Sequence, residues 1–278
     1  MSTQSIPLVG VIGSPVSHSR SPALHAHWLK RYGINGHYVP LEVSTDDLPG
    51  VLSAMPKMGF VGANVTIPHK EAVVALAHRV SDRADVIGAA NTLVFGEEGL
   101  INADNTDGYG FTENLRQAIP EWNPSSAPCA VFGAGGASRA VIAALIDLGA
   151  PEVRLTNRTF ARAEALEEQF GEPVVALPWQ DTRHVLDGCE TVVNTTSLGM
   201  EGQPPFVLDL SSIAESAVAT DLVYTPLKTP FLEAAEAAGA RTVDGLGMLI
   251  HQAVPGFERW FGTRPAADDA ARKAVLGA

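Results

Sequence analysis

The stretch CAVFGAGGASRAVIAAL, residues 129–145, decides the fold. A short apolar run at 129–132 leads into a glycine-rich turn at 133–138, and a helical pattern follows directly. Glycines allow a tight turn and let backbone N–H groups approach a diphosphate at the positive end of a helix. Ser138 stands at the third glycine position of GxGxxG, but the strand, turn and helix occur in the required order. We expect cofactor contacts from Gly133, Ala134, Gly135, Gly136 and Ala137.

The next apolar run, residues 152–157, ends without an acidic side chain. An NAD site usually places Asp or Glu about 20 residues after the first glycine, where it binds the ribose 2′-hydroxyl. Here Arg158 follows the end of the run, and Arg162 lies one helical turn later. A guanidinium pairs with a 2′-phosphate, which a carboxylate would repel. The pattern favours NADP(H) over the alternative, two arginines at a solvated helix start.

Short β-branched runs alternate with helical patterns along most of the chain, which is typical of parallel sheets covered by helices. The exception is NTLVFGEEGLINADNT, residues 91–106, whose central glycines and glutamates predict the turn of an antiparallel hairpin. The predicted class is therefore α/β with one mixed sheet. The expected strands lie at 8–13, 37–43, 62–67, 129–134, 152–157, 173–177, 191–196, 218–223 and 241–245.

Composition excludes several functional classes. The chain has 278 residues and a net charge of −12, which disfavours binding to nucleic acid or anionic lipid. No apolar run reaches the ~18 residues that a membrane span needs, and the N-terminus lacks the pattern of a secretory signal. The two cysteines, Cys129 and Cys189, each begin an apolar run, so we expect buried, reduced thiols and a cytoplasmic protein.

Polar residues in the first half stand at predicted strand ends and turns, where a rigid scaffold presents functional groups. Ser17 and Ser19 follow the first strand and suit a polyol or carboxylate, although turn and capping chemistry could account for one of them. Farther on, the strand of GANVTIPHKEAV, residues 62–73, stops at Pro68, and two titratable residues follow at once. We expect Pro68 to start the next helix, and either His69 or Lys70 to carry chemistry.

These motifs resemble the shikimate dehydrogenase family over nearly the whole chain. The family reduces 3-dehydroshikimate to shikimate with NADPH, on the route to the aromatic amino acids. The resemblance implies a substrate domain at 1–108 and 246–278, closed by C-terminal helices, and an inserted Rossmann NADP-binding domain at 109–245. It rests on SPVSHSRSP, NVTIPHK, GAANTL, NTDGYG, GAGGASRA, NRT, NTTSLGM, DLVYTPLKTP and DGLGMLIHQA, in that order.

The resemblance also implies roles for individual residues. Lys70 matches the proposed catalytic acid/base and Asp107 its partner, which leaves His69 a structural role. Ser17 and Ser19 match carboxylate binders, and no metal is implied. Matches to substrate contacts are Thr66, Asn91, Tyr224 and Gln252. The adenosine-phosphate clamp matches Asn157, Arg158, Thr159 and Arg162, and the nicotinamide-side loop matches Gly247 and Met248.

Two other functions stay open at this stage. A broader quinate/shikimate dehydrogenase often carries Thr at the second serine position and an acidic residue within the NRT motif, whereas this chain has Ser19 and Asn157-Arg158-Thr159. A non-catalytic NADP-binding regulator on the same fold is disfavoured because Lys70 and Asp107 are both present. The expected partners are small molecules, with no nucleic acid and no membrane, in a monomer or a homodimer.

Overall fold

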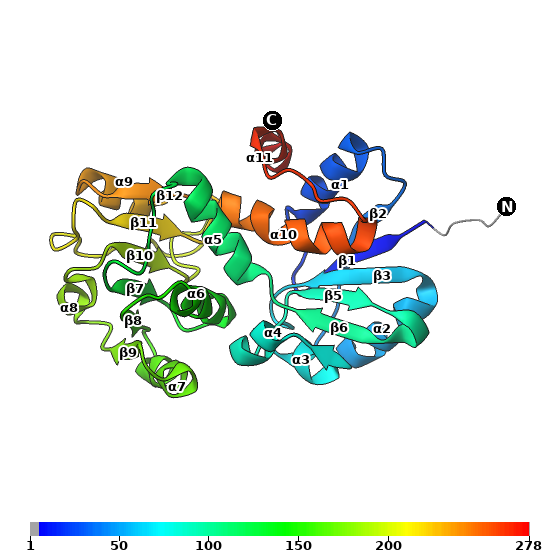
Figure 1. Ribbon diagram of the computed structural model, residues 1–278, viewed down its shortest axis with the longest axis horizontal. Helices are drawn as coiled ribbons and strands as arrows, with labels where there is room; N and C mark the ends of the chain where they lie inside the picture. The colour runs from blue at the N-terminus through cyan, green and yellow to red at the C-terminus, as the bar shows by residue number, and fades with distance from the viewer. Residues whose placement is uncertain (1–5, 278) are drawn as a thin grey trace. The chain divides into compact units, whose positions relative to one another are not determined.

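The computed structural model describes residues 6–277 and divides into two compact units, each built on its own sheet (Figure 1). Unit 1 comprises Met1–Gly110 and Leu249–Ala278, and unit 2 comprises Phe111–Met248. The chain passes into unit 2 within α5 (Asp107–Ala118) and returns within α10 (Leu246–Phe261). The sequence places these transitions at 108–109 and 245–246, a few residues earlier.

The sheet of unit 1 has six strands in the order β2-β1-β3-β5-β6-β4. Strand β5 runs antiparallel to β3 and β6, so the predicted hairpin and the mixed sheet are confirmed. A 3₁₀ turn, Glu97–Gly99, closes the hairpin. The pattern missed β4, because two residues cannot show a period. The strands are β1 (Leu8–Gly13), β2 (His37–Glu42), β3 (Phe60–Val65), β4 (Arg79–Val80), β5 (Thr92–Phe95) and β6 (Ile101–Asp104).

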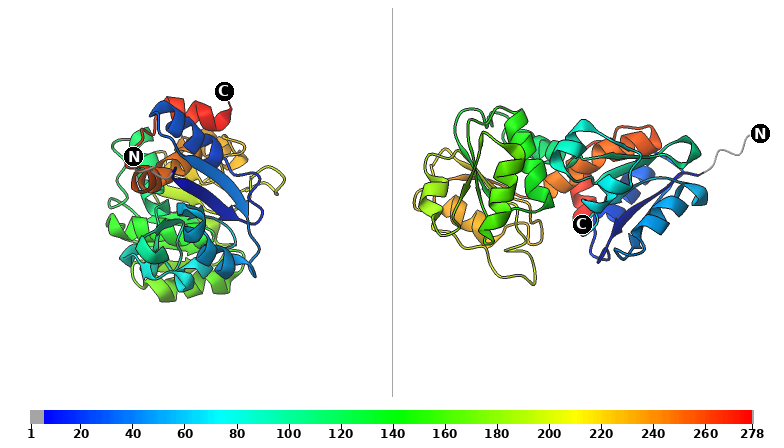
Figure 2. Two further views of the ribbon diagram at one scale, coloured as in Figure 1. Left: turned by 90° about the vertical axis from the view of Figure 1, so that its right-hand side faces the viewer. Right: turned by 90° about the horizontal axis from the view of Figure 1, so that it is seen from below.

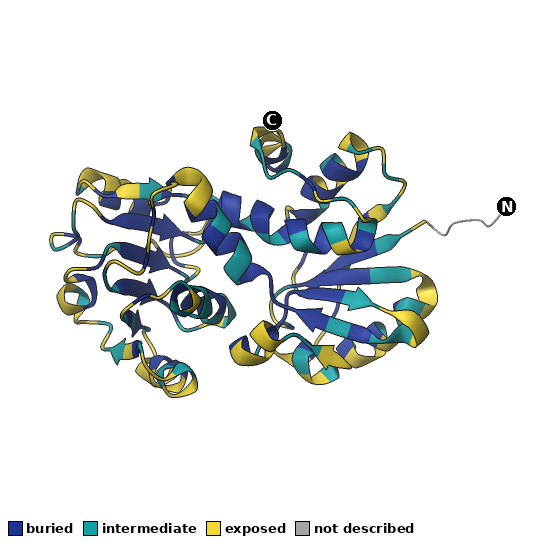
Figure 3. Cartoon of the chain, viewed as in Figure 1, coloured by how far each residue is buried: buried dark blue, intermediate teal, exposed yellow. Residues whose placement is uncertain are grey.

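Helices cover both faces of this sheet (Figures 1 and 2). Alternate residues of each strand point to opposite faces. Val9 and Val11 therefore join a cluster with Trp260 of α10, while Ile12 joins a cluster with Leu52 of α2. The inner strands β1, β3, β5 and β6 are mostly buried, whereas the edge strand β2 and the outer sides of the helices carry many exposed residues (Figure 3). The helices are α1 (Ser21–Arg31), α2 (Leu48–Ala54), α3 (Ala72–Leu76), α4 (Asp82–Ile87) and α11 (Asp269–Leu276), with a 3₁₀ turn at Pro56–Met58.

The prediction that Pro68 starts a helix is wrong, because α3 begins only at Ala72. The N–H of His69 donates to the carbonyl of Thr66 at 2.9 Å, which closes a tight turn around Pro68. The carbonyl of Lys70 accepts the N–H of Ala90 at 2.8 Å. This loop therefore binds to the start of the hairpin before the helix begins.

Unit 2 has a six-stranded parallel sheet in the order β12-β11-β10-β7-β8-β9. This is the strand order of a dinucleotide-binding fold, in which ligands bind at the carboxyl ends of the two central strands, here β7 and β10. The predicted α/β class is confirmed. The strands are β7 (Cys129–Phe132), β8 (Val153–Thr156), β9 (Val174–Leu177), β10 (Thr191–Asn194), β11 (Val218–Asp221) and β12 (Arg241–Val243).

The sheet of unit 2 is also covered on both faces. One hydrophobic cluster joins its strands to α5, α6 (Gly136–Asp147) and α7 (Phe160–Phe170). A second cluster joins them to α8 (Thr182–Leu186) and α9 (Pro230–Ala237). Within residues 6–277, no helix has both the length and the apolar character that crossing a membrane requires.

The prediction of buried, reduced cysteines is confirmed. Cys129 and Cys189 are free thiols, and both are buried. Burial raises the pKa of each thiol to about 12, so neither forms a thiolate near neutral pH.

His25 on α1 is fully buried in an aromatic cluster of unit 1. Its ring stacks on Tyr38 at a centroid distance of 3.8 Å and meets Trp28 edge-on at 5.6 Å. Neither ring nitrogen has a hydrogen-bond partner among the described residues. Burial lowers the pKa of His25 from 6.5 to about 3, so the folded protein keeps the ring neutral.

This neutral histidine should make the protein sensitive to acid. The unfolded chain takes up a proton below about pH 6.5 and the folded chain does not, so stability falls as pH drops toward 3. At pH 4.5 the expected loss is about 2–3 kcal/mol relative to pH 7. Thermal unfolding at both pH values should show a smaller loss for His25→Phe than for the wild type. Equal losses would contradict this account.

Candidate active site

Lys70 and Asp107 meet in unit 1. The Nζ of Lys70 lies 2.6 Å from Oδ2 of Asp107, and their side chains are 19% and 7% exposed. Lys70 follows the carboxyl end of β3, and Asp107 begins α5 after the carboxyl end of β6. A carboxylate at the start of a helix is stabilised by the helix dipole, and here it also fixes the lysine ammonium. The structure thus brings together the two residues that the resemblance pairs.

Asn91 binds the other oxygen of the same carboxylate. Its Nδ2 donates to Oδ1 of Asp107 at 2.8 Å and to Oε1 of Gln252 at 3.2 Å. Its Oδ1 accepts the N–H of Thr106 and the hydroxyl of Thr92, each at 2.9 Å. A primary amide has two donor hydrogens and two acceptor lone pairs. All four of these positions on Asn91 are therefore used within the protein.

The other predicted substrate contacts of unit 1 keep unused hydrogen-bonding capacity. Thr66 follows β3 and is half-buried, and its Oγ1 has no partner within residues 6–277. Ser17 is exposed and its hydroxyl is likewise unpaired over that range. Ser19 Oγ instead accepts the N–H of Ser21 at the start of α1, at 3.3 Å. A turn contact thus accounts for Ser19, whereas the described residues offer no such contact for Ser17.

His69 has the structural role that the resemblance leaves to it. Its ring is fully buried, and Nε2 lies 2.7 Å from the carbonyl of Val43. A carbonyl can only accept, so Nε2 carries the hydrogen and the ring ties this turn to the end of β2. Of the two titratable neighbours, Lys70 is the one whose side chain is partly accessible and paired with a carboxylate.

In unit 2, the glycine turn lies at the carboxyl ends of β7 and β10. Gly133 has a φ of +112°, and a Cβ there would come within 2.6 Å of Thr195 Oγ1, so only glycine fits. Beside Gly135 and Gly136, by contrast, a Cβ would meet nothing within 4 Å. The first N–H groups of α6 have no intrahelical acceptor, so the open side of the turn can receive a diphosphate.

Ser138 completes this turn with a chain of hydrogen bonds. The N–H of Gly135 donates to Ser138 Oγ at 3.0 Å, and Ser138 Oγ lies 2.7 Å from Thr195 Oγ1. Thr195 Oγ1 donates to the carbonyl of Phe132 at 2.8 Å, so Ser138 is the donor to Thr195. Ser138, which stands in place of the third glycine, thus links the turn to the ends of β7 and β10.

No carboxylate directly follows the end of β8; Arg158 lies in the loop after it, and Arg162 lies in the first turn of α7. Arg158 and Arg162 are exposed, and neither forms an ion pair with another described residue. Asn157 Nδ2 donates to the carbonyl of Thr159 at 2.9 Å, which shapes the loop before α7. A 2′-phosphate fits this donor set, in which two guanidinium groups are available. NADP(H) therefore matches the residues that the turn and the β8 end present.

The remaining predicted contacts of unit 2 differ from expectation in one respect. Gly247 and Met248 do not form a loop but lie buried in the first turn of α10. A Cβ on Gly247 would come within 1.8 Å of Asn114 Oδ1, so this glycine allows α5 and α10 to pack closely. Met248 joins the hydrophobic cluster of unit 2. Tyr224 is half-buried in the loop after β11.

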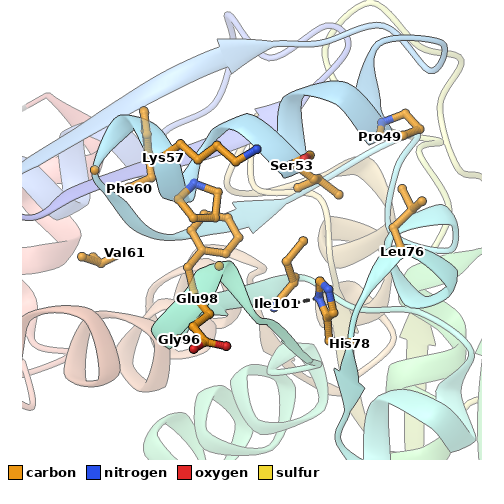
Figure 4. Close-up of a pocket in the computed structure, with 15 residues that line it drawn as sticks. Pro49, Ser53, Lys57, Phe60, Val61, Leu76, His78, Gly96, Glu98 and Ile101 are labelled. Carbon is orange, nitrogen blue, oxygen red and sulfur yellow. Dashed lines mark hydrogen bonds between the residues drawn. The ribbon is translucent and has the colours of Figure 1, made fainter.

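A cavity of about 690 Å³ lies elsewhere in unit 1 (Figure 4). It is lined by Phe60 and Ile101 at the starts of β3 and β6, and by Phe95 at the end of β5. Lys70, Asp107 and Asn91 lie at the opposite ends of these strands. The cavity is therefore separate from the candidate active site.

Comparisons with known proteins agree with this geometry. Family models match residues 11–93 (shikimate dehydrogenase substrate binding domain), 115–201 (shikimate/quinate 5-dehydrogenase) and 245–276 (shikimate 5′-dehydrogenase C-terminal domain). A shikimate dehydrogenase (NADP+) of Cereibacter sphaeroides is 64% identical over 98% of this chain and 97% of its own length. The chain belongs to the shikimate dehydrogenase family. The resemblance seen in the motifs is confirmed.

Solved structures of this family have the same fold. A shikimate 5-dehydrogenase from Thermus thermophilus, in complex with NADP(H) and shikimate, is 38% identical with a TM-score of 0.87, over 98% of this chain and 99% of that one. A quinate dehydrogenase from Corynebacterium glutamicum, in complex with NAD, is 32% identical with a TM-score of 0.90 over the same shares. The fold thus serves both cofactors, so cofactor choice depends on local residues.

Sequence reasoning missed two polar residues of the site, Thr92 and Thr106. Both are fully buried and both hydrogen-bond to Asn91. A threonine at the start of a strand, such as Thr92, is indistinguishable from an ordinary β-branched residue. Thr106 could have been noticed, because it stands between two polar residues in NTD.

Replacing Ser138 should test the hydrogen-bond chain of the glycine turn. In Ser138→Ala, Gly135 loses its acceptor and Thr195 its donor, so the free energy of unfolding should fall by about 1 kcal/mol in urea titration. Ser197→Ala, at an exposed position after β10, is the control and should change it by less than about 0.5 kcal/mol. Identical urea midpoints for wild type and Ser138→Ala would show that the chain adds no stability.

Proposed function

We propose that this protein catalyses the reversible, NADPH-dependent reduction of 3-dehydroshikimate to shikimate. The observation that carries the proposal is the hydrogen-bonded set Lys70, Asp107 and Asn91 in a chain of this family. Relatives that are 57–64% identical are named shikimate dehydrogenase (NADP+). Lys70 is the residue to which we assign proton transfer.

The proposed chemistry needs a hydride at the carbonyl carbon and a proton at the carbonyl oxygen. NADPH supplies the hydride when it is bound. Lys70 has three N–H hydrogens, one of which faces Asp107, so the ammonium can also point a hydrogen at a substrate oxygen. It stabilises the negative charge that develops there and donates the proton. Asp107 keeps the ammonium in place.

The remaining groups of unit 1 suit a polyhydroxylated carboxylic acid. Ser17 and Thr66 offer unpaired hydroxyls. Gln252 uses its Oε1 for Asn91 and one Nε2 hydrogen for the carbonyl of Leu249, so a second hydrogen is available. We assign substrate contacts to these three residues and, as the family motif implies, to Ser19 and Tyr224. The amide of Asn91 is fully used within the protein, so we assign it to holding Asp107 and Gln252 in place.

In unit 2 we assign the diphosphate to the glycine turn and the 2′-phosphate to Arg158 and Arg162. A cytoplasmic location is part of the proposal, because two free, buried thiols fit a reducing compartment.

One assay tests this proposal as a whole. Purified protein is mixed with NADP+ or NAD+, and with shikimate, quinate or neither, and reduction of the nicotinamide is followed by absorbance. We expect the highest kcat/KM with shikimate and NADP+. A higher value with quinate would indicate the broader enzyme, and no turnover with either acid would contradict the proposal.

Substitution of Lys70 should remove the proton donor. Lys70→Met keeps the length of the side chain without its charge, and kcat should fall by about 10²–10⁴-fold with a smaller change in the KM for shikimate. His69→Gln is the comparison, because a glutamine amide can still donate to Val43, and it should keep kcat within about threefold. An inactive His69→Gln beside an active Lys70→Met would reverse the assignment.

Substitution of Arg158 should change cofactor preference. Arg158→Ala removes a charged hydrogen bond to the 2′-phosphate, so the KM for NADPH should rise about tenfold or more. The KM for NADH should stay the same, since NADH lacks this phosphate. Arg183→Ala, an exposed arginine of α8, is the control and should change neither value. Equal increases for both cofactors would be inconsistent with a 2′-phosphate at Arg158.

A further inference from the structure

Thr106 lies between β6 and α5, one residue before Asp107, and its side chain is fully buried. Its Oγ1 lies 2.8 Å from the carbonyl of Gln252, 3.0 Å from Oδ1 of Asn91 and 3.2 Å from Oγ1 of Thr92. Its backbone N–H donates to the same Oδ1 of Asn91 at 2.9 Å. This one residue therefore contacts two members of the candidate site and precedes a third.

Counting protons decides the direction of each bond. The hydroxyl of Thr106 has one hydrogen, and the Gln252 carbonyl, which can only accept, is its shortest contact. The hydroxyl of Thr92 then donates to Asn91 Oδ1, and the Thr106 N–H fills the second lone pair there. Because this N–H can only donate, the oxygen of Asn91 must face it. The Nδ2 of Asn91 is thereby directed at Asp107 and Gln252.

The helix that carries Gln252 contains a proline close to that residue. Pro255 lies inside α10 and has no N–H to donate to the carbonyl four residues earlier, that of His251. The next carbonyl is that of Gln252, which accepts the Thr106 hydroxyl. Two hydrogen bonds, from Thr106 to the backbone and from Asn91 to the side chain, thus set the position of Gln252 relative to Asp107.

We propose that Thr106 is a positioning residue, whose hydroxyl holds Gln252 on α10 in register with Asn91 and Asp107. This rests on the proposed function, in which Gln252 contacts the substrate and Asp107 holds the lysine. Thr106 itself does not touch the substrate. Loss of its hydroxyl should affect shikimate and not NADP(H), because its partners Gln252, Asn91 and Thr92 all belong to unit 1, whereas we assign the phosphates of NADP(H) to residues of unit 2.

Two substitutions separate the hydroxyl from the volume of the side chain. Thr106→Val removes the hydroxyl at nearly constant shape, and kcat/KM for shikimate should fall about tenfold or more, in line with the loss of one buried hydrogen bond to Gln252. Thr106→Ser keeps the hydroxyl and should stay within about threefold of wild type. The KM for NADP+ should not change in either variant. Equal losses in both, or none in Thr106→Val, would overturn the proposal.

A double-mutant cycle tests whether the effect passes through Gln252. In a Gln252→Ala background, Thr106→Val should lower kcat/KM by less than about threefold more, because the side chain that Thr106 positions is already gone. Fully multiplicative losses would assign the effect of Thr106 to general packing and overturn the proposal. Thr220→Val, a buried threonine of β11, is the control for hydroxyl loss elsewhere and should leave kcat/KM unchanged.

Folding and binding measurements complete the test. Circular dichroism monitors the Val and Ser variants and a third, Thr106→Ala. If only Thr106→Ser of the three folds, the hydroxyl serves stability and the proposal is wrong. Calorimetry with shikimate alone should show weaker binding to Thr106→Val than to wild type, and equal binding would contradict the proposal. A wild type that does not oxidise shikimate overturns the proposed function, whereas an active wild type with an unimpaired Thr106→Val overturns only the positioning role.

Discussion

The hydrogen bond from the Asn91 amide to the Asp107 carboxylate is the contact on which the site of unit 1 depends. Both residues are almost fully buried, and a buried carboxylate is costly unless it is paired. The surrounding polar residues meet that requirement. Asn105 Oδ1 accepts the N–H of Asp107, and Lys70 pairs with the second carboxylate oxygen. The loop after β3, the start of β5 and the start of α5 are thereby held together.

A second buried carboxylate, that of Asp104 at the end of β6, has a different role. Burial by itself would raise its pKa, but hydrogen bonds from Arg83, Ser81 and Arg259 lower it below the usual value. Arg83 lies on α4 and Arg259 on α10, so Asp104 ties both helices to the end of β6. Through Arg259 it also fixes α10 about two turns beyond Gln252. Both carboxylate oxygens of Asp104 pair with arginines, whereas Asp107 pairs with a lysine whose other N–H hydrogens can still donate.

Periodicity and glycine placement predicted most of the fold. The hairpin at 91–106 and the turn at 133–138 have strong local signals, because a φ of +112° at Gly133 excludes other residues. The pattern failed where tertiary contacts decide. Proline suits the first turn of a helix, yet Pro68 lies in a tight turn bound to Ala90. Gly247 resembles a loop residue in sequence, but it lies in α10, where the absence of a side chain makes room for Asn114 of α5.

Histidine and lysine at 69 and 70 show why chemical suitability in a sequence does not assign a role. A histidine titrates nearer neutral pH and is the more obvious proton carrier. Burial and hydrogen bonding favour the lysine here, because the His69 ring is fully buried with its Nε2 on the Val43 carbonyl, whereas Lys70 is partly accessible. The same test applies to the whole site within the described residues. Asn91 has no free donor or acceptor, while Lys70, Thr66, Ser17 and Gln252 each keep one. Unused hydrogen-bonding capacity on an accessible side chain, which only the folded chain reveals, distinguishes groups that can bind a ligand from groups that hold them in place.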